Sequence, residues 1–112
     1  MAKVSWDSGR TKTLTIAQSG TTTDVLDLGS DGTWSGMQIG ILSPAALTGT
    51  VTVEVCDTEA GTFRTLQSDG SDIALTATKA AVLDPVPFRY LRIKSSGAEA
   101  SARNFVLVGR RV

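Results

Sequence analysis

Two stretches of the sequence decide the fold: Val51-Thr-Val-Glu-Val-Cys-Asp-Thr-Glu-Ala-Gly-Thr-Phe-Arg-Thr-Leu66 and Phe88-Arg-Tyr-Leu-Arg-Ile-Lys-Ser-Ser-Gly97. Apolar and polar residues alternate in both, and a period of two residues is typical of strands that are buried on one face. An acidic, glycine-containing turn interrupts the first stretch, which therefore predicts a β-hairpin. Together the two stretches predict the later strands of a β-sandwich that presents surfaces rather than performing chemistry.

The composition agrees with this prediction. The 112 residues are enough for one domain, which would bury roughly two thirds of the surface of the unfolded chain. Hydrophobic residues make up 41% of the chain but aromatic residues only 5%, so the core must consist mainly of Val, Leu, Ile and Ala. We expect residues 1–11 to form an N-terminal arm or irregular lead-in, and residues 12–112 to form a single β-sandwich domain.

Further strands are expected between the turn signals along the chain. Six more segments are short and alternating or apolar: residues 12–17, 24–28, 37–42, 72–77, 80–83 and 102–110. No segment has the period of a long amphipathic helix, and the connection over 43–49 has room for one helical turn at most. The sequence therefore predicts an all-β fold, a β-sandwich of about eight antiparallel strands.

Charge is balanced overall but uneven along the chain. Residues 1–60 carry three basic and seven acidic groups, a net charge of −4, whereas residues 61–112 carry eight basic and four acidic groups, a net charge of +4. A sandwich interleaves its halves, so folding either cancels this polarity or leaves it to favour head-to-tail contacts between copies. Neither the net charge nor a dense run of Lys and Arg favours binding to nucleic acid.

The residue types argue against an enzyme and against a metal site. The chain has no histidine and one cysteine, which removes the usual general base, every Ser-His-Asp or Cys-His arrangement, and structural zinc. Asp24, Asp27 and Asp31 lie close together in sequence, as the carboxylates of a glycosidase or of a calcium loop would. Solvated aspartates that cap turns are the ordinary interpretation of such a cluster. We therefore expect no catalytic residues, no cofactor and no metal.

The lone cysteine and the start of the chain bear on the compartment. Cys56 excludes an intrachain disulfide, and both an inert thiol and an intermolecular disulfide remain open. The first residues, Met1-Ala-Lys-Val-Ser-Trp6, lack the apolar core of a signal peptide, and no stretch is long and apolar enough to span a membrane. We expect a soluble protein, made in the cytoplasm, without a membrane partner.

Two tryptophans and the basic end of the chain are candidate contacts. Trp6 and Trp34 lie in segments predicted to be outside strands. There an indole plugs the open end of a sandwich, anchors a protein interface or stacks on a sugar. Arg103, Arg110 and Arg111 make the last strand basic, which either protects a sheet edge from pairing or docks on an acidic partner surface.

The two deciding stretches resemble the discoidin or galactose-binding jelly-roll family. That family has an alternating strand, an Asp-containing turn, an aromatic residue and a leucine, and later an aromatic-Arg-Tyr-Leu/Val-Arg-Ile/Leu strand. The corresponding segments here are residues 51–66 and 88–93. The resemblance implies a jelly-roll topology. The chain departs from the family because it is shorter and has no flanking disulfide and no aromatic-plus-Arg sugar site in its loops.

A second resemblance, over nearly the full length, is to small structural proteins of tailed bacteriophages. These share a Thr-rich first strand and a series of short segments, from Asp-x-Leu-Asp-Leu-Gly to Leu-Asp-Pro and Arg-Tyr-Leu-Arg-Ile-Lys-Ser. The corresponding segments occur here in the same order, at residues 24–29, 37–41, 44–52, 83–85 and 89–95. The resemblance implies a many-copy head-decoration, head-fibre-base or tail-associated component of a virion.

We therefore hypothesise a non-enzymatic structural protein of a bacteriophage virion, synthesised in the cytoplasm of the bacterial host. It self-associates, with a trimer as one arrangement, and docks on capsid or tail proteins through sheet edges, apolar patches and the N-terminal arm. The alternative is a carbohydrate-binding module. In that case Trp34 and Tyr90 stack on a surface glycan, and Arg92 or an aspartate hydrogen-bonds to its hydroxyls.

Overall fold

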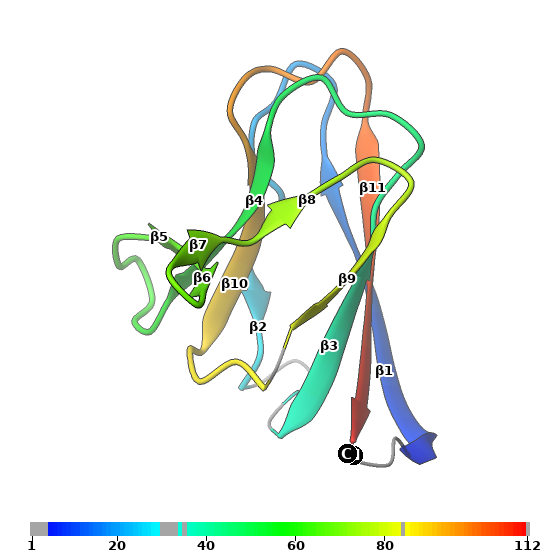
Figure 1. Ribbon diagram of the computed structural model, residues 1–112. Coiled ribbons are helices and arrows are strands. Elements are labelled where there is room, and N and C mark those ends of the chain that lie inside the picture. Colours follow the sequence, from blue (N-terminus) through cyan, green and yellow to red (C-terminus); the bar gives the residue numbers. More distant parts are fainter. Residues whose placement is uncertain (1–4, 30–33, 35, 84, 112) are drawn as a thin grey trace.

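The computed structural model describes residues 5–29, 34, 36–83 and 85–111, and it is an all-β sandwich with no helix in these ranges (Figure 1). The strands, in chain order, are β1 (Ser5–Ile16), β2 (Leu26–Asp27), β3 (Met37–Leu42), β4 (Val51–Cys56), β5 (Arg64–Thr65), β6 (Gln67–Ser68), β7 (Ser71–Asp72), β8 (Ala74–Leu75), β9 (Ala80–Leu83), β10 (Tyr90–Ser95) and β11 (Arg103–Arg111).

The strands form two packed antiparallel sheets with the topology of a jelly roll. Sheet A has the order β1-β11-β3-β9, and sheet B has the order β2-β10-β4-β5, with β8 also paired to β4. When β5 and β8 are counted as one edge strand and the β6–β7 hairpin is left out, the two sheets contain eight strands. Numbered 1 to 8 in chain order, these strands run 1-8-3-6 in sheet A and 2-7-4-5 in sheet B. This is the double Greek key of a jelly roll. The predicted jelly-roll sandwich of about eight antiparallel strands is therefore confirmed.

The edge strand of sheet B is split by a small hairpin. β5 pairs with the end of β4 at Glu54 and Val55, whereas β8 pairs with its start at Val51 and Thr52. Between them, β6 and β7 form a separate two-stranded hairpin that leaves the edge. Its base is closed by the amide of Ile73, which donates to the carbonyl of Leu66 at 3.0 Å. A split edge of this kind offers no long row of free backbone groups for pairing.

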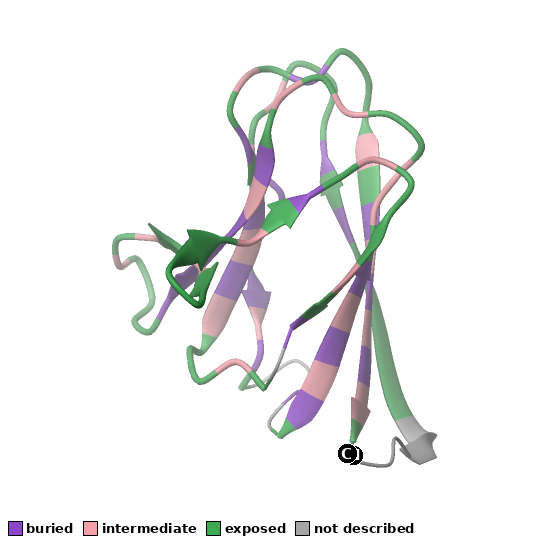
Figure 2. Cartoon of the chain, in the orientation of Figure 1, coloured by how far each residue is buried: buried purple, intermediate pink, exposed green. Residues whose placement is uncertain are grey.

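The core lies between the two sheets and is built from alternate residues of the strands. Along β3, buried residues alternate with partly exposed ones, and the bands can be followed in Figure 2. Each fully buried Leu, Ile, Val or Phe side chain contributes about 1.5–3 kcal/mol relative to an exposed one. The largest apolar side chains that are completely buried are Leu14, Ile16, Leu26, Met37, Ile39, Ile41, Leu91, Ile93, Phe105 and Leu107.

One local prediction is wrong. Strand β1 starts at Ser5, so residues 5–11 are not an irregular lead-in, and residues 1–4 lie outside the described part of the chain. β1 is an edge strand whose residues 9–13 are exposed, and for that reason its first half has no apolar alternation to detect. Residues 43–49 contain no helical turn. The hairpin predicted over 51–66 is present, with Glu54 paired to Thr65.

Candidate functional site

The outer face of sheet B is charged, and its charges are paired with one another. Arg92 on β10 lies directly opposite Glu54 on β4, and its Nε is 2.8 Å from Glu54 Oε1. The Arg92 guanidinium also stacks over the ring of Phe63, 4.1 Å from its centroid. Lys94 Nζ lies 3.9 Å from the second Glu54 oxygen. The predicted contact residue Arg92 is therefore held by its own chain on two sides.

Tyr90 borders a depression at the end of the same face. The depression has a volume of about 390 Å³, and its walls include Val25, Phe63 and Tyr90. Arg89 lies across it, with Nε 3.0 Å from Asp27 Oδ1 and its guanidinium carbon 5.5 Å from the Tyr90 ring centroid. The hydrogen bond from Arg89 and the charge of Asp27 raise the pKa of Arg89, which stays cationic. Two aromatic rings and an accessible ion pair thus meet at one hollow.

These ion pairs also settle what happens to the uneven charge of the sequence. Asp27 and Glu54 come from the acidic first half of the chain, and Arg89 and Arg92 come from the basic second half. The jelly roll places the two halves in adjacent strands of sheet B. Local pairing along this face therefore offsets part of the polarity of the sequence.

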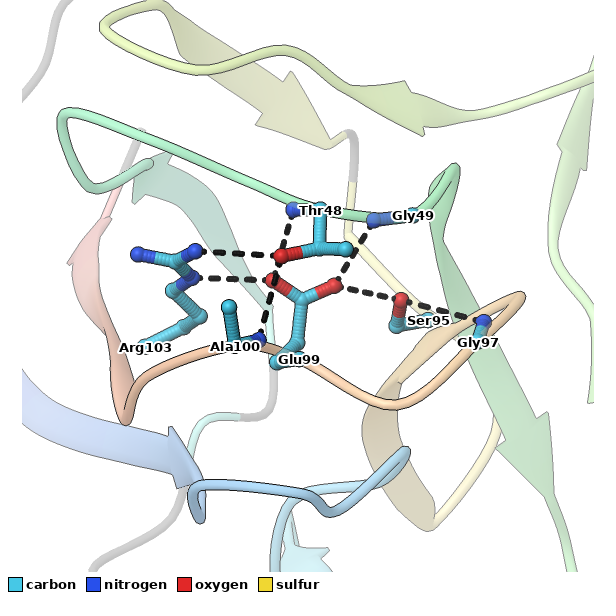
Figure 3. Close-up of polar contacts among 7 residues, drawn as sticks. All are labelled: Thr48, Gly49, Ser95, Gly97, Glu99, Ala100 and Arg103. Carbon is cyan, nitrogen blue, oxygen red and sulfur yellow. Dashed lines mark hydrogen bonds and ion pairs between the residues drawn. The ribbon is translucent and has the colours of Figure 1, made fainter.

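A buried carboxylate at the opposite end of the sandwich joins three loops (Figure 3). The side chain of Glu99 is fully buried, and each of its two carboxylate oxygens accepts two hydrogen bonds. Oε1 accepts from the amide of Thr48 at 2.8 Å and from Arg103 Nε at 2.9 Å. Oε2 accepts from the amide of Gly49 at 2.9 Å and from the hydroxyl of Ser95 at 2.6 Å. We call these five residues the Glu99 cluster.

The ionisation of Glu99 follows from this geometry. Burial by itself would raise the pKa of Glu99, but the hydrogen bonds from Ser95, Thr48, Gly49 and Arg103 outweigh it and lower the pKa to about 2. Its backbone joins the third loop, because the carbonyl of Glu99 accepts from Ser19 and its amide donates to Gly20. The cluster therefore fixes three loops to one another.

Arg103 therefore has a different role from the one predicted. Its side chain is only 14% exposed and binds both Glu99 and the hydroxyl of Thr48. It closes the Glu99 cluster and is not free to dock on an acidic partner. Glu99 was not among the residues predicted from the sequence, and its only local signal is an acidic residue between alanines with an arginine four residues later.

The structure describes the side chain of only one of the two tryptophans that were predicted to be contacts. Trp34 is buried, and its indole lies against the backbone of β11, so close that a Cβ at Gly109 would lie 2.7 Å from it. It plugs the end of the sandwich, one of the three roles considered for it, and does not offer its face to a sugar. Trp6 lies in strand β1, and its side chain is outside the described part of the structure.

The remaining chemical candidates are the cysteine and the three aspartates near the start of the chain. The Cys56 thiol is buried and donates to the carbonyl of Thr58 at 3.0 Å. Asp24 is exposed, Asp27 is paired with Arg89, and Asp31 lies outside the described residues. Within the described ranges, no three of the His, Cys, Asp and Glu side chains are grouped so that they could hold a metal ion.

The outer face of sheet A has a different character from that of sheet B. Residues paired directly across neighbouring strands point to the same side of a sheet, and two such rows run over the outside of sheet A. Neither row contains a charged residue. Leu42 is 49% exposed and Val82 is 67% exposed. We call these rows the uncharged face, and they consist of Thr13, Val106, Leu42 and Ala80 in the first row and Thr11, Val108, Gly40 and Val82 in the second.

The last two candidate residues lie at the end of strand β11. Arg110 is partly buried and paired with Gln38, and its Nη1 donates to the carbonyl of Gly109 at 3.0 Å. Arg111 is exposed and paired with Met37. The structure thus brings Arg110 next to the uncharged face, whereas Arg111 shares the inner side of sheet A with the buried Met37, and Tyr90 and Arg92 belong to the outer face of sheet B.

Comparisons with protein families, with curated proteins and with solved structures find no match to this chain. Over the described residues, no helix has the length and apolar character needed to cross a membrane.

Proposed function

We propose that the chain is a non-enzymatic structural protein of a bacteriophage virion, a capsid decoration or head-fibre-base protein. It docks on neighbouring virion proteins and on copies of itself. The virion location rests on the sequence resemblance to small structural proteins of tailed phages. The docking role is supported by one observation above all, the uncharged face on the outside of sheet A.

The composition of strand β11 supports docking on this face. Phe105-Val-Leu-Val108 is apolar at every position, and a continuous apolar run is typical of a strand that is covered on both faces. The core covers Phe105 and Leu107 completely, whereas Val106 and Val108 are only partly buried. A protein partner would complete the burial that the strand's sequence favours.

The charged side chains support a role without catalysis. Glu99 and Arg103 hold loops together, and Glu54 and Arg92 are paired across two strands. Groups that are engaged in this way stabilise the fold and are not poised to transfer protons to a substrate. The sandwich acts as a rigid support for its outer surfaces.

Mass spectrometry of purified virions from the producing strain tests the proposal. We expect the chain to be present in many copies per particle, at a stoichiometry comparable with a capsid or tail protein. A Leu42→Lys variant should reach the particle in fewer copies, because lysine places a charge on the uncharged face. Thr65→Lys on the outer face of sheet B is the matched control and should be incorporated normally. Absence of the wild-type chain from the particle overturns the proposal.

A carbohydrate-binding module remains the second candidate, supported by the depression beside Tyr90. Aromatic rings that border accessible charged groups are the usual elements of a sugar site. Trp34 is not part of this site, because it is buried in the core. Titration against a glycan panel, followed by NMR, tests the candidate. Saturable binding that Tyr90→Ala abolishes would favour it, and no shift with any glycan would exclude it.

A further inference from the structure

The centre of the uncharged face holds a glycine that the folded chain itself does not need. Gly40 lies in the middle of β3, between Val108 and Val82. A Cβ built on Gly40 would meet only two backbone oxygens, of Val108 at 3.8 Å and of Ala81 at 3.9 Å, which are ordinary contacts. Its φ is not positive, unlike those of Gly36 and Gly70. Glycine within a strand weakens the strand, so its presence points to a close approach from outside.

Gly109 on the neighbouring strand β11 differs from Gly40, because the core leaves no room for a side chain there. A Cβ there would lie 2.7 Å from the Trp34 indole, so this glycine has a reason within the core. Gly40 faces the other side of the sheet, and it leaves a hollow between two valines of the outer row. Apart from the two chain neighbours of Gly40, the described atoms within 4 Å of a Cβ at this position are the backbone oxygens of Val108 and Ala81, so no side chain fills the space.

The same face also carries the side chains that fit such a hollow. Leu42 and Val82 are among the most exposed large hydrophobic residues of the described chain. Leu42 lies two positions after Gly40 on β3, and Val82 is paired with Gly40 from β9. In an interface with two-fold symmetry, one surface patch meets an identical patch, so a hollow and a projecting group must occur on the same face. The uncharged face meets this requirement.

We infer that the uncharged face binds the uncharged face of a second copy of this chain, with an apolar side chain of each copy filling the hollow at Gly40 of the other. The inference deepens the self-association included in the proposed function. A two-fold axis in the plane of the interface, perpendicular to the strands, reverses their direction. It places Arg110 of each copy over the Asn104 end of the other, so that the two arginines lie at opposite ends and do not repel each other.

The size of the face indicates how strong this contact is. Four strands spaced about 4.8 Å apart and two rows spaced about 6.8 Å apart give a face of roughly 260 Å² in projection for each copy. Stable interfaces bury about 800 Å² of accessible surface per partner, and smaller ones are typical of weak complexes. We therefore expect a dimer that forms at high protein concentration and dissociates on dilution.

Sedimentation equilibrium of the full chain over a wide concentration range, combined with thermal unfolding, tests the inference. Gly40→Thr fills the hollow with a residue that favours strands. We expect its dimer dissociation constant to rise at least tenfold while its unfolding temperature is equal to or above that of the wild type. Leu42→Lys should weaken the dimer as well, and Thr65→Lys on sheet B should leave it unchanged.

Three results would overturn the inference. They are a wild-type chain that stays monomeric at the highest concentration, a Gly40→Thr variant that dimerises like the wild type, and a large fall in its unfolding temperature. The last would mean that the glycine has a role inside the chain. A monomer in solution that is abundant in purified virions would refute the self-pairing and leave the virion role intact. A chain that dimerises in solution but is absent from virions would refute the virion role and leave the self-pairing intact.

Discussion

Replacing Glu99 with glutamine tests whether the Glu99 cluster holds one end of the sandwich together. The substitution keeps the size and shape of the side chain but removes its charge and converts one acceptor oxygen into an NH2 donor. All four groups around the carboxylate are donors. The best placement puts the NH2 group toward Ser95, whose hydroxyl can turn to accept, but it then faces the amide of Gly49.

The magnitude follows from the groups that lose a partner. A buried N–H left without an acceptor costs about 1–3 kcal/mol, and hydrogen bonds to a charged group are worth about 1.5–3 kcal/mol. Removing one partner of a buried ion pair typically costs about 3–5 kcal/mol, and the Arg103 side chain is only 14% exposed. We therefore expect Glu99→Gln to lower the free energy of unfolding by about 3–5 kcal/mol, or roughly 10–20 °C in unfolding temperature.

The effect should depend on pH in a defined direction. The pKa of Glu99 is lowered from 4.5 to about 2 in the folded protein. A group with a lowered folded-state pKa stabilises the fold above its unfolded-state pKa, and this stabilisation is lost as the pH falls towards the folded-state value. The difference in stability between wild type and Glu99→Gln should thus be constant near neutrality and shrink between about pH 4.5 and 2.

Urea unfolding followed by tryptophan fluorescence at a series of pH values measures both quantities. Asp24→Asn, which neutralises an exposed carboxylate, is the control, and it should change the free energy of unfolding by less than about 0.5 kcal/mol. A loss below about 1 kcal/mol in Glu99→Gln at pH 7 would refute the reasoning about buried donors. A difference that does not shrink on acidification would refute the assignment of a charged Glu99.

Three further predictions concern the core and the outer face of sheet B. Gly109→Ala should cost about 1–3 kcal/mol in urea unfolding, because the added Cβ lies 2.7 Å from the Trp34 indole; an unchanged urea midpoint would contradict this packing. A double-mutant cycle of Arg92→Ala and Glu54→Ala should give a coupling of about 0.5–1 kcal/mol that falls in high salt, and zero coupling at low salt would show that the pair is not formed. Cys56 should react with a thiol reagent only after unfolding, and rapid labelling of the native protein would show that the thiol is accessible.

Most of the strand positions were predictable because alternation is a local property of the sequence. The strand predicted over 37–42 coincides with β3, and the hairpin predicted over 51–66 is formed by β4 and β5. The first half of β1 was not predictable in this way, because an exposed edge strand has no buried side to mark it. The split of one edge strand by the β6–β7 hairpin was also missed, since it depends on which segments pair with β4.

The candidate contacts were less predictable, because the partner of a charged or aromatic side chain is set by residues far away in the sequence. Arg103 is a surface arginine by sequence, but it binds a buried carboxylate. Tyr90 and Arg89 meet Asp27 only because β10 pairs with β2, more than sixty residues earlier in the chain. Trp34 is enclosed because β11 presents a glycine to it.

The sequence by itself determined that the chain is an all-β sandwich with an aliphatic core and no histidine-based chemistry. These properties depend on residue types and on the spacing between near neighbours. Only the tertiary structure decided which charges cancel, that Glu99 joins three loops, and that one sheet carries paired charges while the other presents an uncharged face. Each of these depends on strands and loops that the jelly-roll topology brings together from distant parts of the chain, and no local pattern records that convergence.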